Sequence, residues 1–410
     1  MIPIFPAPRD ASRAPSPIER HDRSGVHLLA LPPLSLYVHF PWCVKKCPYC
    51  DFNSHEHANG AASIPESAYL DALSADLESV LPQVWGRRVH SVFIGGGTPS
   101  LLSAAGLDRL LADVRARLTI EADAEITLEA NPGTFEAEKF ASFRASGVNR
   151  LSIGIQSFDD RFLHALGRIH DGDEARHAVE IAQRHFDNFN LDLMFGLPGQ
   201  SADDAARDVE TARAFAPPHL SLYQLTLEPN TFFAKYPPRL PDDDVLAAIE
   251  CAVAAGVDAG GWSRYEVSAY ARRGFESRHN LNYWNFGDYL GIGAGAHGKL
   301  SFPDRIVRQT RIRHPQRYLD FAARGAALFE EQVVQREALP FEFMLNALRL
   351  VDGFAIARFA QRTGLHASEI EPQLVEAERK GLVARDHMRV RATPLGLKFL
   401  NDLQTLFLAD

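Results

Sequence analysis

Cysteine is scarce in this 410-residue sequence, which contains only four. So few thiols exclude the disulfide framework of small secreted domains and favour a reducing compartment, which we predict to be the cytoplasm. Long hydrophobic runs are missing as well, since no apolar stretch reaches the ~18 residues of a membrane-spanning helix. Positive charge is in the minority, with 43 Lys and Arg against 52 Asp and Glu, and the net charge of −9 argues against nucleic acid as the main partner.

The first 33 residues lack the apolar core of a signal peptide. They combine charged residues with seven prolines, at positions 3, 6, 8, 15, 17, 32 and 33. Because such a composition buries little apolar surface, we predict a disordered N-terminal arm over residues 1–33. The rest of the chain is long enough for a large core and for two or three domains.

Three of the four cysteines stand within eight positions, in Cys43-Val-Lys-Lys-Cys47-Pro-Tyr-Cys50. They follow an apolar, β-branched run over residues 34–40 that predicts a strand. Cysteine thiolates hold iron–sulfur clusters, normally four to a cluster, so three would leave one iron open to a substrate or cofactor. Zinc is an alternative, although structural zinc usually takes four ligands arranged as two spaced pairs. Three thiols without a common function are a further alternative.

The C-x3-C-x2-C pattern after the first strand resembles the signature of radical S-adenosylmethionine (SAM) proteins. Within that superfamily, Tyr37-Val-His-Phe-Pro-Trp-Cys43 resembles the approach segment of the HemN/HemW group, which comprises oxygen-independent coproporphyrinogen III oxidases and related haem chaperones. The resemblance runs from Leu34 to the C-terminus. It implies a partial (β/α)6 barrel, a [4Fe–4S] cluster on Cys43, Cys47 and Cys50, and SAM that chelates the open iron.

Segments with strand character alternate with helical segments along most of the chain. The predicted strands cover residues 34–40, 89–94, 125–130, 150–156, 189–195 and 219–227. The predicted helices cover residues 64–84, 101–118, 135–146, 159–185, 202–215 and 242–259. This alternation predicts an α/β fold of right-handed βαβ units with a parallel sheet. Chemically unusual residues stand on all of these strands, most of them at the carboxyl ends, where (β/α) barrels have their active sites. A doubly wound open sheet would instead gather its ligand groups at one switch point. A closed or C-shaped barrel over residues 34–300 is therefore favoured.

The sequence changes character over residues 301–410. Helical spacing recurs over 340–350, 356–363 and 370–380, and a short hairpin over 381–392 and a helix from Pro394 follow. This order predicts a winged-helix-like α+β domain, similar to the C-terminal domain of the HemN/HemW group. A winged helix suggests DNA binding by analogy alone, so we interpret this part as a cover or partner domain.

The second predicted strand ends in Gly95-Gly-Gly-Thr-Pro99. A glycine-rich turn lets backbone N–H groups approach a ligand closely, and a phosphate loop is disfavoured because no Lys-Ser/Thr follows. A simple tight turn is an equal alternative.

Glu129 and Asp192 stand on otherwise apolar strands, where a buried carboxylate needs a ligand or a basic neighbour, and a structural ion pair is the alternative to a ligand.

The family resemblance implies which residues contact SAM. Gln156 matches within Ile155-Gln-Ser-Phe158, and Arg168 matches within Leu166-Gly-Arg168. The full set that the resemblance implies is Tyr37, Tyr49, Gly96, Gly97, Thr98, Glu129, Gln156, Arg168 and Asp192.

A last chemical group is His279-Asn-Leu-Asn-Tyr-Trp284. A histidine beside two aromatics can be a packed surface cluster, but imidazole is also a common haem ligand and aromatic rings suit a flat macrocycle. The pattern H-N-x-x-Y-W resembles a hallmark of the HemW chaperones, which implies haem contacts by His279, Tyr283 and Trp284. We expect His279 on the barrel rim, apart from the SAM pocket, with a pKa near ~6.5 if it is unperturbed.

An arginine cluster that follows is either a solvated loop or a partner of haem propionates: Arg305, Arg308, Arg311, Arg313 and Arg317.

Two functions of different class fit this resemblance. HemN-type oxidases carry a further cysteine two residues after the third, where this sequence has Phe52. Together with H-N-x-x-Y-W, this favours a haem chaperone over a coproporphyrinogen III oxidase of porphyrin biosynthesis, and radical-mediated haem breakdown is a third alternative. The expected partners are haem, haem-accepting proteins including membrane-associated ones, an electron donor if SAM is cleaved, and a second copy of the chain. Cys251 stands in a small-residue helix and is predicted to be a buried, inert thiol.

Overall fold

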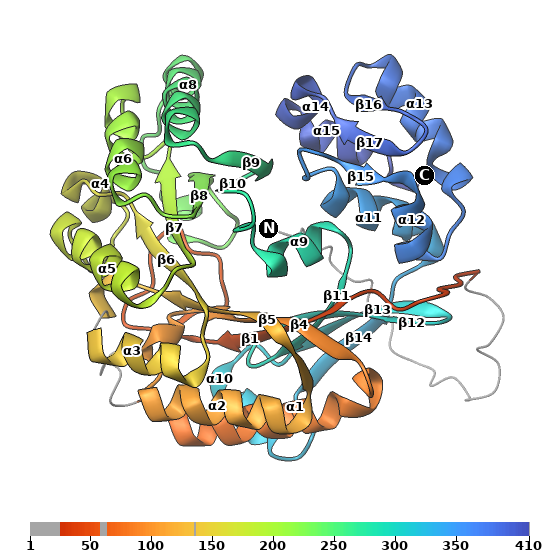
Figure 1. Ribbon diagram of the computed structural model, residues 1–410, viewed down its shortest axis with the longest axis horizontal. Helices are drawn as coiled ribbons and strands as arrows, with labels where there is room; N and C mark the ends of the chain where they lie inside the picture. The colour runs from red at the N-terminus through yellow and green to blue at the C-terminus, as the bar shows by residue number, and fades with distance from the viewer. Residues whose placement is uncertain (1–24, 58–63, 135–136, 410) are drawn as a thin grey trace.

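The computed structural model describes residues 25–57, 64–134 and 137–409 (Figure 1). Its main feature is a twelve-stranded sheet with the order β14-β13-β12-β11-β1-β4-β5-β6-β7-β8-β10-β9. Six neighbouring strands within this sheet run parallel to one another. They are β1 (Leu34–Phe40), β4 (Arg88–Gly96), β5 (Thr119–Ala130), β6 (Arg150–Gln156), β7 (Phe189–Phe195) and β8 (His219–Gln224).

A long helix follows each of these strands and lies on the convex side of the sheet (Figure 1). The edge strands β14 and β9 do not pair with each other, so the sheet is open. This is the partial (β/α)6 barrel that the sequence predicted, and the bounds of β1, β6, β7 and α6 agree with the predicted ones. The helices are α1 (Glu66–Val84), α2 (Ala104–Arg117), α3 (Ala137–Ser146), α5 (Gly172–His185, preceded by the short α4, Asp160–Ala165), α6 (Ala202–Phe215) and α8 (Asp243–Gly260).

The sheet extends beyond the six βα units on both sides. On one side, β8 pairs with β10 (Ala269–Ala271) and β10 with β9 (Ser263–Glu266), both antiparallel. On the other side, β1 pairs in parallel with β11 (Asp288–Ile292), and the antiparallel strands β12 (His297–Phe302), β13 (Arg305–Arg311) and β14 (Leu328–Val333) follow. The sheet therefore runs through Val333, past the domain boundary expected at residue 301, because Leu300 and Val307 bury their side chains in the main core.

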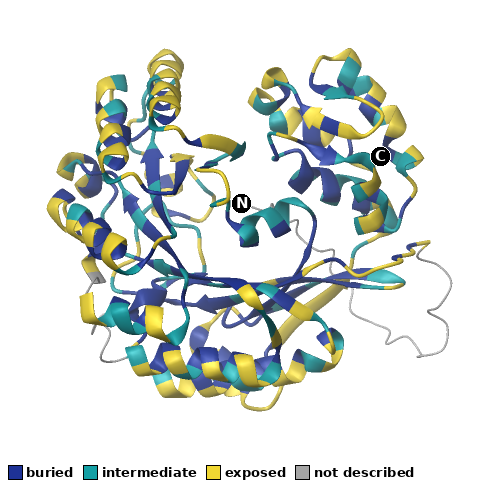
Figure 2. Ribbon diagram, viewed as in Figure 1, coloured by how far each residue is buried: buried dark blue, intermediate teal, exposed yellow. Residues whose placement is uncertain are grey.

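The two faces of the parallel strands differ in chemistry because side chains alternate between them. Leu128, Ile153 and Leu191 are buried in the main core on the face that the helices cover. The sequence neighbours of these residues include Glu129 and Asp192, which therefore belong to the opposite, concave face. Figure 2 shows that the strands are largely buried and that the exposed residues lie mainly on the outer helix surfaces. Polar side chains from several strands thus gather on the concave face, where helix α9 (Arg278–Trp284) also packs.

The C-terminal part of the chain has a core of its own. It contains three helices, α11 (Leu339–Ala347), α12 (Ile356–Thr363) and α13 (Glu371–Arg379), and a three-stranded sheet whose first strand lies between α11 and α12 in the chain. That sheet has the order β15 (Phe354–Ala355), β17 (Arg389–Ala392), β16 (Val383–Arg385), and the helices α14 (Pro394–Lys398) and α15 (Leu400–Thr405) follow it. This succession confirms the winged-helix-like domain that the sequence predicted.

Part of the predicted N-terminal arm is packed against this domain. Val26 and Leu28 are buried and belong to the C-terminal core, and the Leu28 N–H donates to the Pro303 carbonyl at 3.0 Å. The prediction of disorder therefore fails where these two apolar side chains find a core, while residues 1–24 lie outside the described residues. Within the described chain, no helix has the length and apolar character needed to cross a membrane.

A fully buried ion pair fastens the antiparallel extension to the first barrel helix. Arg311 Nε on β13 lies 2.8 Å from Asp76 Oδ1 on α1, and both side chains are inaccessible to solvent. Tyr318, on α10 (Pro315–Ala322), donates to Asp76 Oδ2 at 2.8 Å, and the Gly293 N–H donates to the same oxygen at 3.2 Å. The carboxylate therefore joins three elements and the turn after β11.

Replacing Arg311 by Met should lower the free energy of unfolding by roughly 3–5 kcal/mol, because it leaves the Asp76 carboxylate buried without its charge partner. Urea denaturation measures the change. Arg313→Met is the matched control, since Arg313 is exposed two residues further along the chain. The control should change the unfolding free energy by less than ~0.5 kcal/mol, and equal effects of the two substitutions would contradict the importance of the buried pair.

Candidate functional site

The cysteine loop leaves the carboxyl end of β1 and is held as a short ribbon of β2 (Trp42–Cys43) and β3 (His55–Glu56). Within it, the Cys50 N–H donates to the Cys47 carbonyl at 3.1 Å. Asn53 Nδ2 anchors the far side of the loop by donating to the carbonyls of Ala294, at 2.9 Å, and Arg313, at 2.8 Å. Backbone groups distant in the sequence thus fix the loop at the carboxyl end of the barrel strands.

The three thiols of the loop lie close enough for their charges to interact. Burial raises the pKa of the Cys43 thiol, and the neighbouring Cys50 and Cys47 thiols raise it further. Arg168 Nη1 lies 3.5 Å from Cys47 Sγ, so a cation stands beside the group that would carry negative charge as a thiolate. Among the described residues, no three His, Cys, Asp or Glu side chains are arranged around a single metal ion. A cubane cluster does not require this, because each thiolate binds a different iron.

The glycine-rich turn after β4 is tied to the cysteine ribbon rather than left open to a ligand. The Gly97 N–H donates to the Phe40 carbonyl at 2.6 Å, and the Thr98 N–H donates to the Trp42 carbonyl at 2.8 Å. A Cβ on Gly97 would lie 2.4 Å from the Trp42 oxygen, so only glycine allows this approach. Hydrogen bonds within the protein already use these N–H groups, and the SAM contacts of Gly96, Gly97 and Thr98 stay a prediction.

Two desolvated carboxyl groups lie on the concave face beside this turn. Burial raises the pKa of Glu129 to about 8, with a further rise from Asp192, although the Gly96 N–H donates to Glu129 at 2.9 Å. Burial likewise raises the pKa of Asp192, which accepts hydrogen bonds from Ser152 at 3.0 Å and Asn190 at 2.8 Å. All of these donors are uncharged groups, so a cationic ligand would supply the positive charge that the pair needs.

Four further predicted residues surround the same end of the sheet. Tyr37 donates to, or accepts from, His39 Nδ1 at 2.9 Å, and the charge of Glu129 raises the Tyr37 pKa further than burial alone. Arg168 donates to the Gly154 carbonyl at 2.8 Å, and its buried Nε has no hydrogen-bond partner among the described residues. Tyr49 lies between Arg168 and the cysteine thiols. Gln156 ends β6 with a φ of 68°, a left-handed conformation that is uncommon outside glycine.

His279 lies inside the concave face rather than on the rim, and its ring centroid is 6.5 Å from that of Tyr37. It is only 2% exposed, its ring stacks on Phe93 at 4.9 Å, and its Nδ1 lies 3.1 Å from Ser91 Oγ. The predicted rim position is wrong because α9 is held on β5, where Glu125 accepts the N–H groups of Arg278 at 3.0 Å and His279 at 3.1 Å. Burial lowers the pKa of His279 to about 3, so the expected titration near 6.5 is wrong as well.

Helix α9, which ends with Tyr283 and Trp284, lies between the barrel and the C-terminal domain (Figure 1). The Tyr283 ring centroid is 4.3 Å from that of Tyr289. The Arg349 guanidinium covers the Trp284 ring at 4.3 Å and pairs with Glu266 of β9 at 2.9 Å. One face of Trp284 is therefore occupied by a cation from the C-terminal domain.

The arginine cluster does not form the solvated loop that was one of its two alternatives, and the pairing with haem propionates stays a prediction. It begins on strand β13, where Arg311 pairs with Asp76 and Arg308 pairs with Glu342 while donating to the Tyr289 hydroxyl at 2.7 Å. Arg305 pairs with its neighbour Asp304 at 2.9 Å. Those arginines are engaged because the antiparallel extension brings acidic partners from distant segments, and only Arg313 and Arg317 are exposed.

Three other side chains were misjudged or missed. Cys251 is exposed rather than buried, because α8 buries Ile249 and Val253 on its opposite face. His39 was not predicted as a site residue, yet it is buried under the glycine turn and its Nε2 lies 3.0 Å from the Asn53 carbonyl. Its signal in the sequence was a histidine within an apolar strand. Phe52 is 57% exposed on the cysteine loop.

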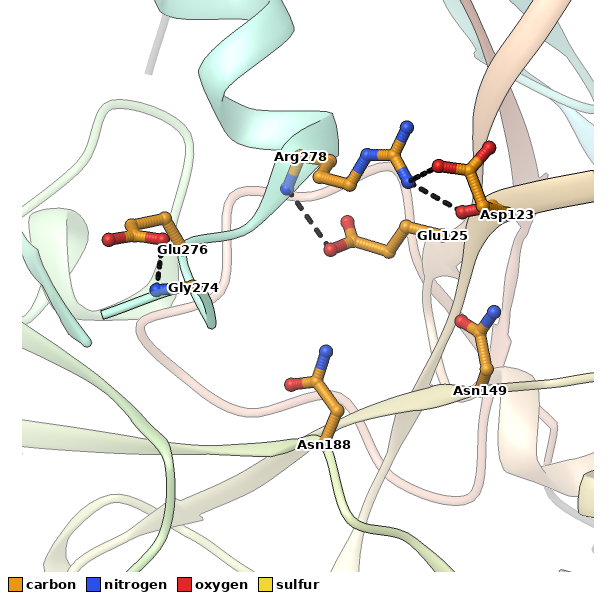
Figure 3. A pocket seen from close by; sticks show the side chains of 7 residues that line it. All are labelled: Asp123, Glu125, Asn149, Asn188, Gly274, Glu276 and Arg278. Carbon is orange, nitrogen blue, oxygen red and sulfur yellow. Dashed lines mark hydrogen bonds and ion pairs between the residues drawn. The ribbon is translucent and has the colours of Figure 1, made fainter. Parts of the chain in front are cut away.

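A separate pocket of about 150 Å³ opens at the amino ends of β5, β6 and β7, away from the cysteine loop (Figure 3). Arg278 crosses it and pairs with Asp123 at 3.2 Å, and the Arg278 N–H donates to Glu125. These contacts hold the start of α9, so the residues that line the pocket have a structural role in positioning that helix. Its lining comprises Asp123, Glu125, Asn149, Asn188, Gly274, Glu276 and Arg278.

Comparisons with known proteins agree with this geometry. The sequence profile of the Radical SAM superfamily matches residues 37–212, and that of the HemN C-terminal domain matches residues 334–399. The protein named Heme chaperone HemW of Escherichia coli K12 is 49% identical over 385 residues, which cover 93% of this chain and 100% of that protein. The chain belongs to the HemW family.

More distant HemW relatives extend the comparison. The Bacillus subtilis protein of the same name is 34% identical, over 92% of this chain and 99% of that protein. The bovine mitochondrial protein named Radical S-adenosyl methionine domain-containing protein 1 is 35% identical, over 90% of this chain and 86% of its own length. The solved structure of the oxidase HemN from Escherichia coli has a TM-score of 0.77 at 24% identity, covering 92% of this chain and 90% of that one, and it supports the fold alone.

Membership of the radical SAM superfamily implies a [4Fe–4S] cluster and SAM, and the residues present fit both groups. Cys43, Cys47 and Cys50 converge in one loop beside Arg168. The carboxyl pair of Glu129 and Asp192 suits a ligand with ammonium and sulfonium charges. Both sets of groups stand at the carboxyl ends of the strands, the usual position of active sites in (β/α) barrels.

Anaerobic reconstitution of the wild-type HemW-family chain should yield about four irons per chain, and replacing Cys43, Cys47 and Cys50 together by Ala should abolish this content. Iron analysis and the absorption of the cluster measure both. Cys251→Ala is the matched control and should keep its iron, because Cys251 is exposed on another helix. A cluster retained in the triple variant would refute the assignment.

Glu129→Ala should weaken SAM binding by roughly 1.5–3 kcal/mol, the scale of a charged hydrogen bond, while the cluster spectrum stays unchanged. The wild-type affinity should also fall as pH drops below about 8, because the Glu129 carboxyl then takes up a proton that a cationic ligand must displace. Equilibrium titration measures both effects. The exposed Glu210→Ala is the control, and equal affinity in Glu129→Ala and wild type would count against this pocket.

Proposed function

We propose that the chain is a haem chaperone of the HemW type, which holds a [4Fe–4S] cluster, binds SAM, and binds haem for delivery to acceptor proteins. The observation that carries the proposal is the 49% identity to the relative named Heme chaperone HemW over the whole length of that protein. The intact His279-Asn-Leu-Asn-Tyr-Trp284 pattern supports the same conclusion. A cytoplasmic location, a homodimer, membrane-associated acceptors, and an electron donor if SAM is cleaved belong to the same proposal.

SAM is proposed to bind at the carboxyl ends of the strands, between the cysteine loop and the carboxyl pair. When bound, the cluster offers SAM an open iron and an electron. The chain's own part is electrostatic and geometric: Glu129 and Asp192 balance positive charge, while Arg168 and Gln156 supply hydrogen-bond donors. The neighbouring residues orient these groups: the Gly96 N–H donates to Glu129, and Tyr49 interacts with Arg168. Tyr37, Gly97 and Thr98 complete the proposed pocket.

Haem is proposed to bind at α9, next to the SAM pocket, since the Tyr37 ring centroid lies 6.5 Å from that of His279. His279 Nε2 and Trp284 Nε1 are buried atoms without a hydrogen-bond partner among the described residues, so each can gain from a ligand. Burial keeps His279 neutral by lowering its pKa to about 3, and the neutral imidazole is the form that ligates iron. Tyr283 is the neighbouring ring that can stack on a macrocycle, and Trp284 can do so on the face that Arg349 leaves free.

A coproporphyrinogen III oxidase is the alternative, and Phe52 argues against it. Oxidases of the related group carry a cysteine at this position, whereas here a phenylalanine with 57% exposure ends the motif. The structural likeness to HemN does not favour the oxidase, because at 24% identity it reflects the fold alone. Decarboxylation of coproporphyrinogen by the reconstituted chain, supplied with SAM and a reductant, should therefore be absent.

His279→Ala should abolish or strongly weaken haem binding while leaving cluster content and SAM affinity intact. In the wild type, haem affinity should stay constant between about pH 5.5 and 8, because an imidazole with a pKa of about 3 remains neutral throughout. Haem titration followed in the Soret band measures both. His177→Ala, an exposed histidine on α5, is the control. Haem binding unaffected by His279→Ala, together with decarboxylation, would replace the chaperone by the oxidase.

A further inference from the structure

At the carboxyl end of β6, the backbone of Gln156 is strained. A hydrogen-bonding side chain on helix α6, on the outer side of the sheet, holds it in this conformation. Gln156 adopts a φ of 68°, and the pairing of β6 with β7 shifts register between Gly154 and Gln156. A non-glycine residue in the left-handed region costs of order 1–3 kcal/mol and persists only where its surroundings impose it. Here the restraint acts on the two residues that follow in the sequence, Ser157 and Phe158.

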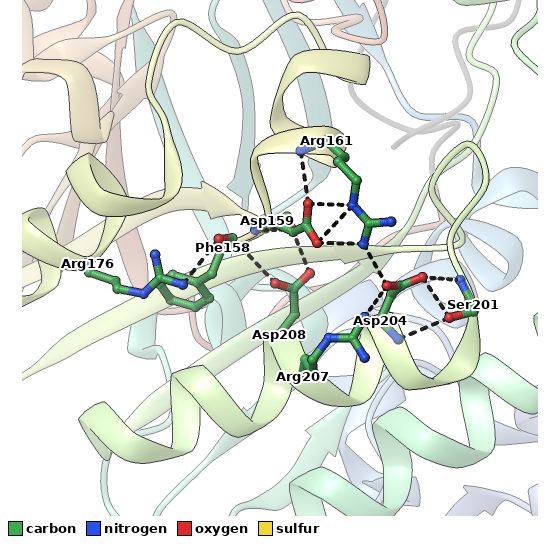
Figure 4. A network of polar contacts seen from close by, with 9 residues as sticks. Phe158, Asp159, Arg161, Arg176, Ser201, Asp204, Arg207 and Asp208 are labelled. Atoms are coloured by element: carbon green, nitrogen blue, oxygen red, sulfur yellow. Dashed lines mark hydrogen bonds and ion pairs between the residues drawn. The ribbon is translucent and has the colours of Figure 1, made fainter.

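Asp208 on α6 binds both residues that follow Gln156 (Figure 4). Its Oδ1 accepts the Phe158 N–H at 2.8 Å, and its Oδ2 accepts the Ser157 hydroxyl at 2.7 Å. Ser157 Oγ in turn accepts the Asp159 N–H at 3.1 Å. Asp208 is 5% exposed and Ser157 is inaccessible, so water cannot replace these bonds. The carboxylate therefore fixes the turn on the side opposite the concave face.

The strained conformation brings the Gln156 amide over the backbone of Gly154. A Cβ on Gly154 would lie 2.9 Å from Gln156 Nε2 and 3.5 Å from Arg168 Nη2. Arg168 itself reaches Cys47 Sγ at 3.5 Å. Arg168 and the Gln156 amide thus both border Gly154, whose carbonyl accepts from Arg168 at 2.8 Å, and the turn after Gln156 leads on to Asp208.

We propose that Asp208 is a positioning residue, which holds Gln156 in the left-handed conformation and so directs its amide into the SAM pocket beside Arg168. Without the two hydrogen bonds the turn relaxes. Part of the binding free energy of SAM is then needed to restore the strained conformation, so SAM binds more weakly. The inference rests on the proposed SAM site, and it adds a residue that touches neither SAM nor the cluster. Asp208 acts only through the backbone of residues 156–158.

The test is SAM affinity of the reconstituted full-length chain, measured by equilibrium titration for Asp208→Ala, Gln156→Ala and the double variant. Asp208→Ala should weaken SAM binding about tenfold, the change that corresponds to roughly 1.4 kcal/mol, within the strain of one left-handed residue. The double variant should bind SAM as Gln156→Ala does, because Asp208 has nothing left to position. Asp208→Asn should restore most of the affinity, since its amide can accept from Phe158 and donate to Ser157.

Asp204→Ala is the matched control. Asp204 is also buried on α6, but it pairs with Arg161 and Arg207 and caps the helix through Ser201 (Figure 4). The control should lower thermal stability without changing SAM affinity. Should Asp208→Ala fail to fold, Ser157→Ala gives the same test, because it removes only one of the two hydrogen bonds.

The outcomes separate this inference from the SAM site on which it rests. If Gln156→Ala binds SAM as the wild type does, Gln156 is not part of the pocket and the proposed site fails at that residue. If Gln156→Ala weakens binding but Asp208→Ala does not, or if the two effects multiply in the double variant, the positioning role is overturned and the site stands.

Discussion

Two backbone hydrogen bonds, from Gly97 to Phe40 and from Thr98 to Trp42, connect the cysteine ribbon to the end of β4. The rest of the site depends on them, because three thiols can meet one cluster only if the loop that carries them is fixed. The close approach explains why the turn must be glycine at residue 97, where a side chain would meet the Trp42 carbonyl. The same turn donates from Gly96 to Glu129 and thereby orients the first carboxyl group of the pocket.

The alternation of side chains across parallel strands explains why the pocket is charged while the sheet is stable. One face of β5 and β7 is apolar and lies under helices, so folding is driven there. On the other face, the hydrogen-bond donors to Glu129 and Asp192 are uncharged, and the charge of Arg150 only partly offsets the effect of burial on Asp192, so the pKa of both carboxyl groups stays raised and an electrostatic cost remains. In the proposed SAM site, the positive charge of the ligand offsets that cost, so the two carboxyl groups contribute to the affinity.

The sequence predicted what local patterns determine and failed where partners are distant. Strands β1, β6 and β7 follow from short apolar runs, and the cysteine spacing locates the loop without a structure. The placement of Arg311 could not be predicted, because its partner Asp76 is 235 residues away. His279 was expected on the rim for the same reason: the Ser91 hydroxyl that holds it lies 188 residues earlier. Asp208 carried no motif, and only the turn that it binds reveals its role.

The burial of His279 changes how haem binding can be controlled. An imidazole with a pKa of about 3 does not gain a proton at physiological pH, so protonation cannot release the iron. In the proposed haem site, access to the His279 Nε2 atom is the remaining means of control, because the side chain is only 2% exposed. The packing around α9 includes the Arg349 guanidinium, which comes from the C-terminal domain, covers Trp284 and pairs with Glu266 on the barrel. The C-terminal domain thus contributes part of the cover over the residues at which haem is proposed to bind.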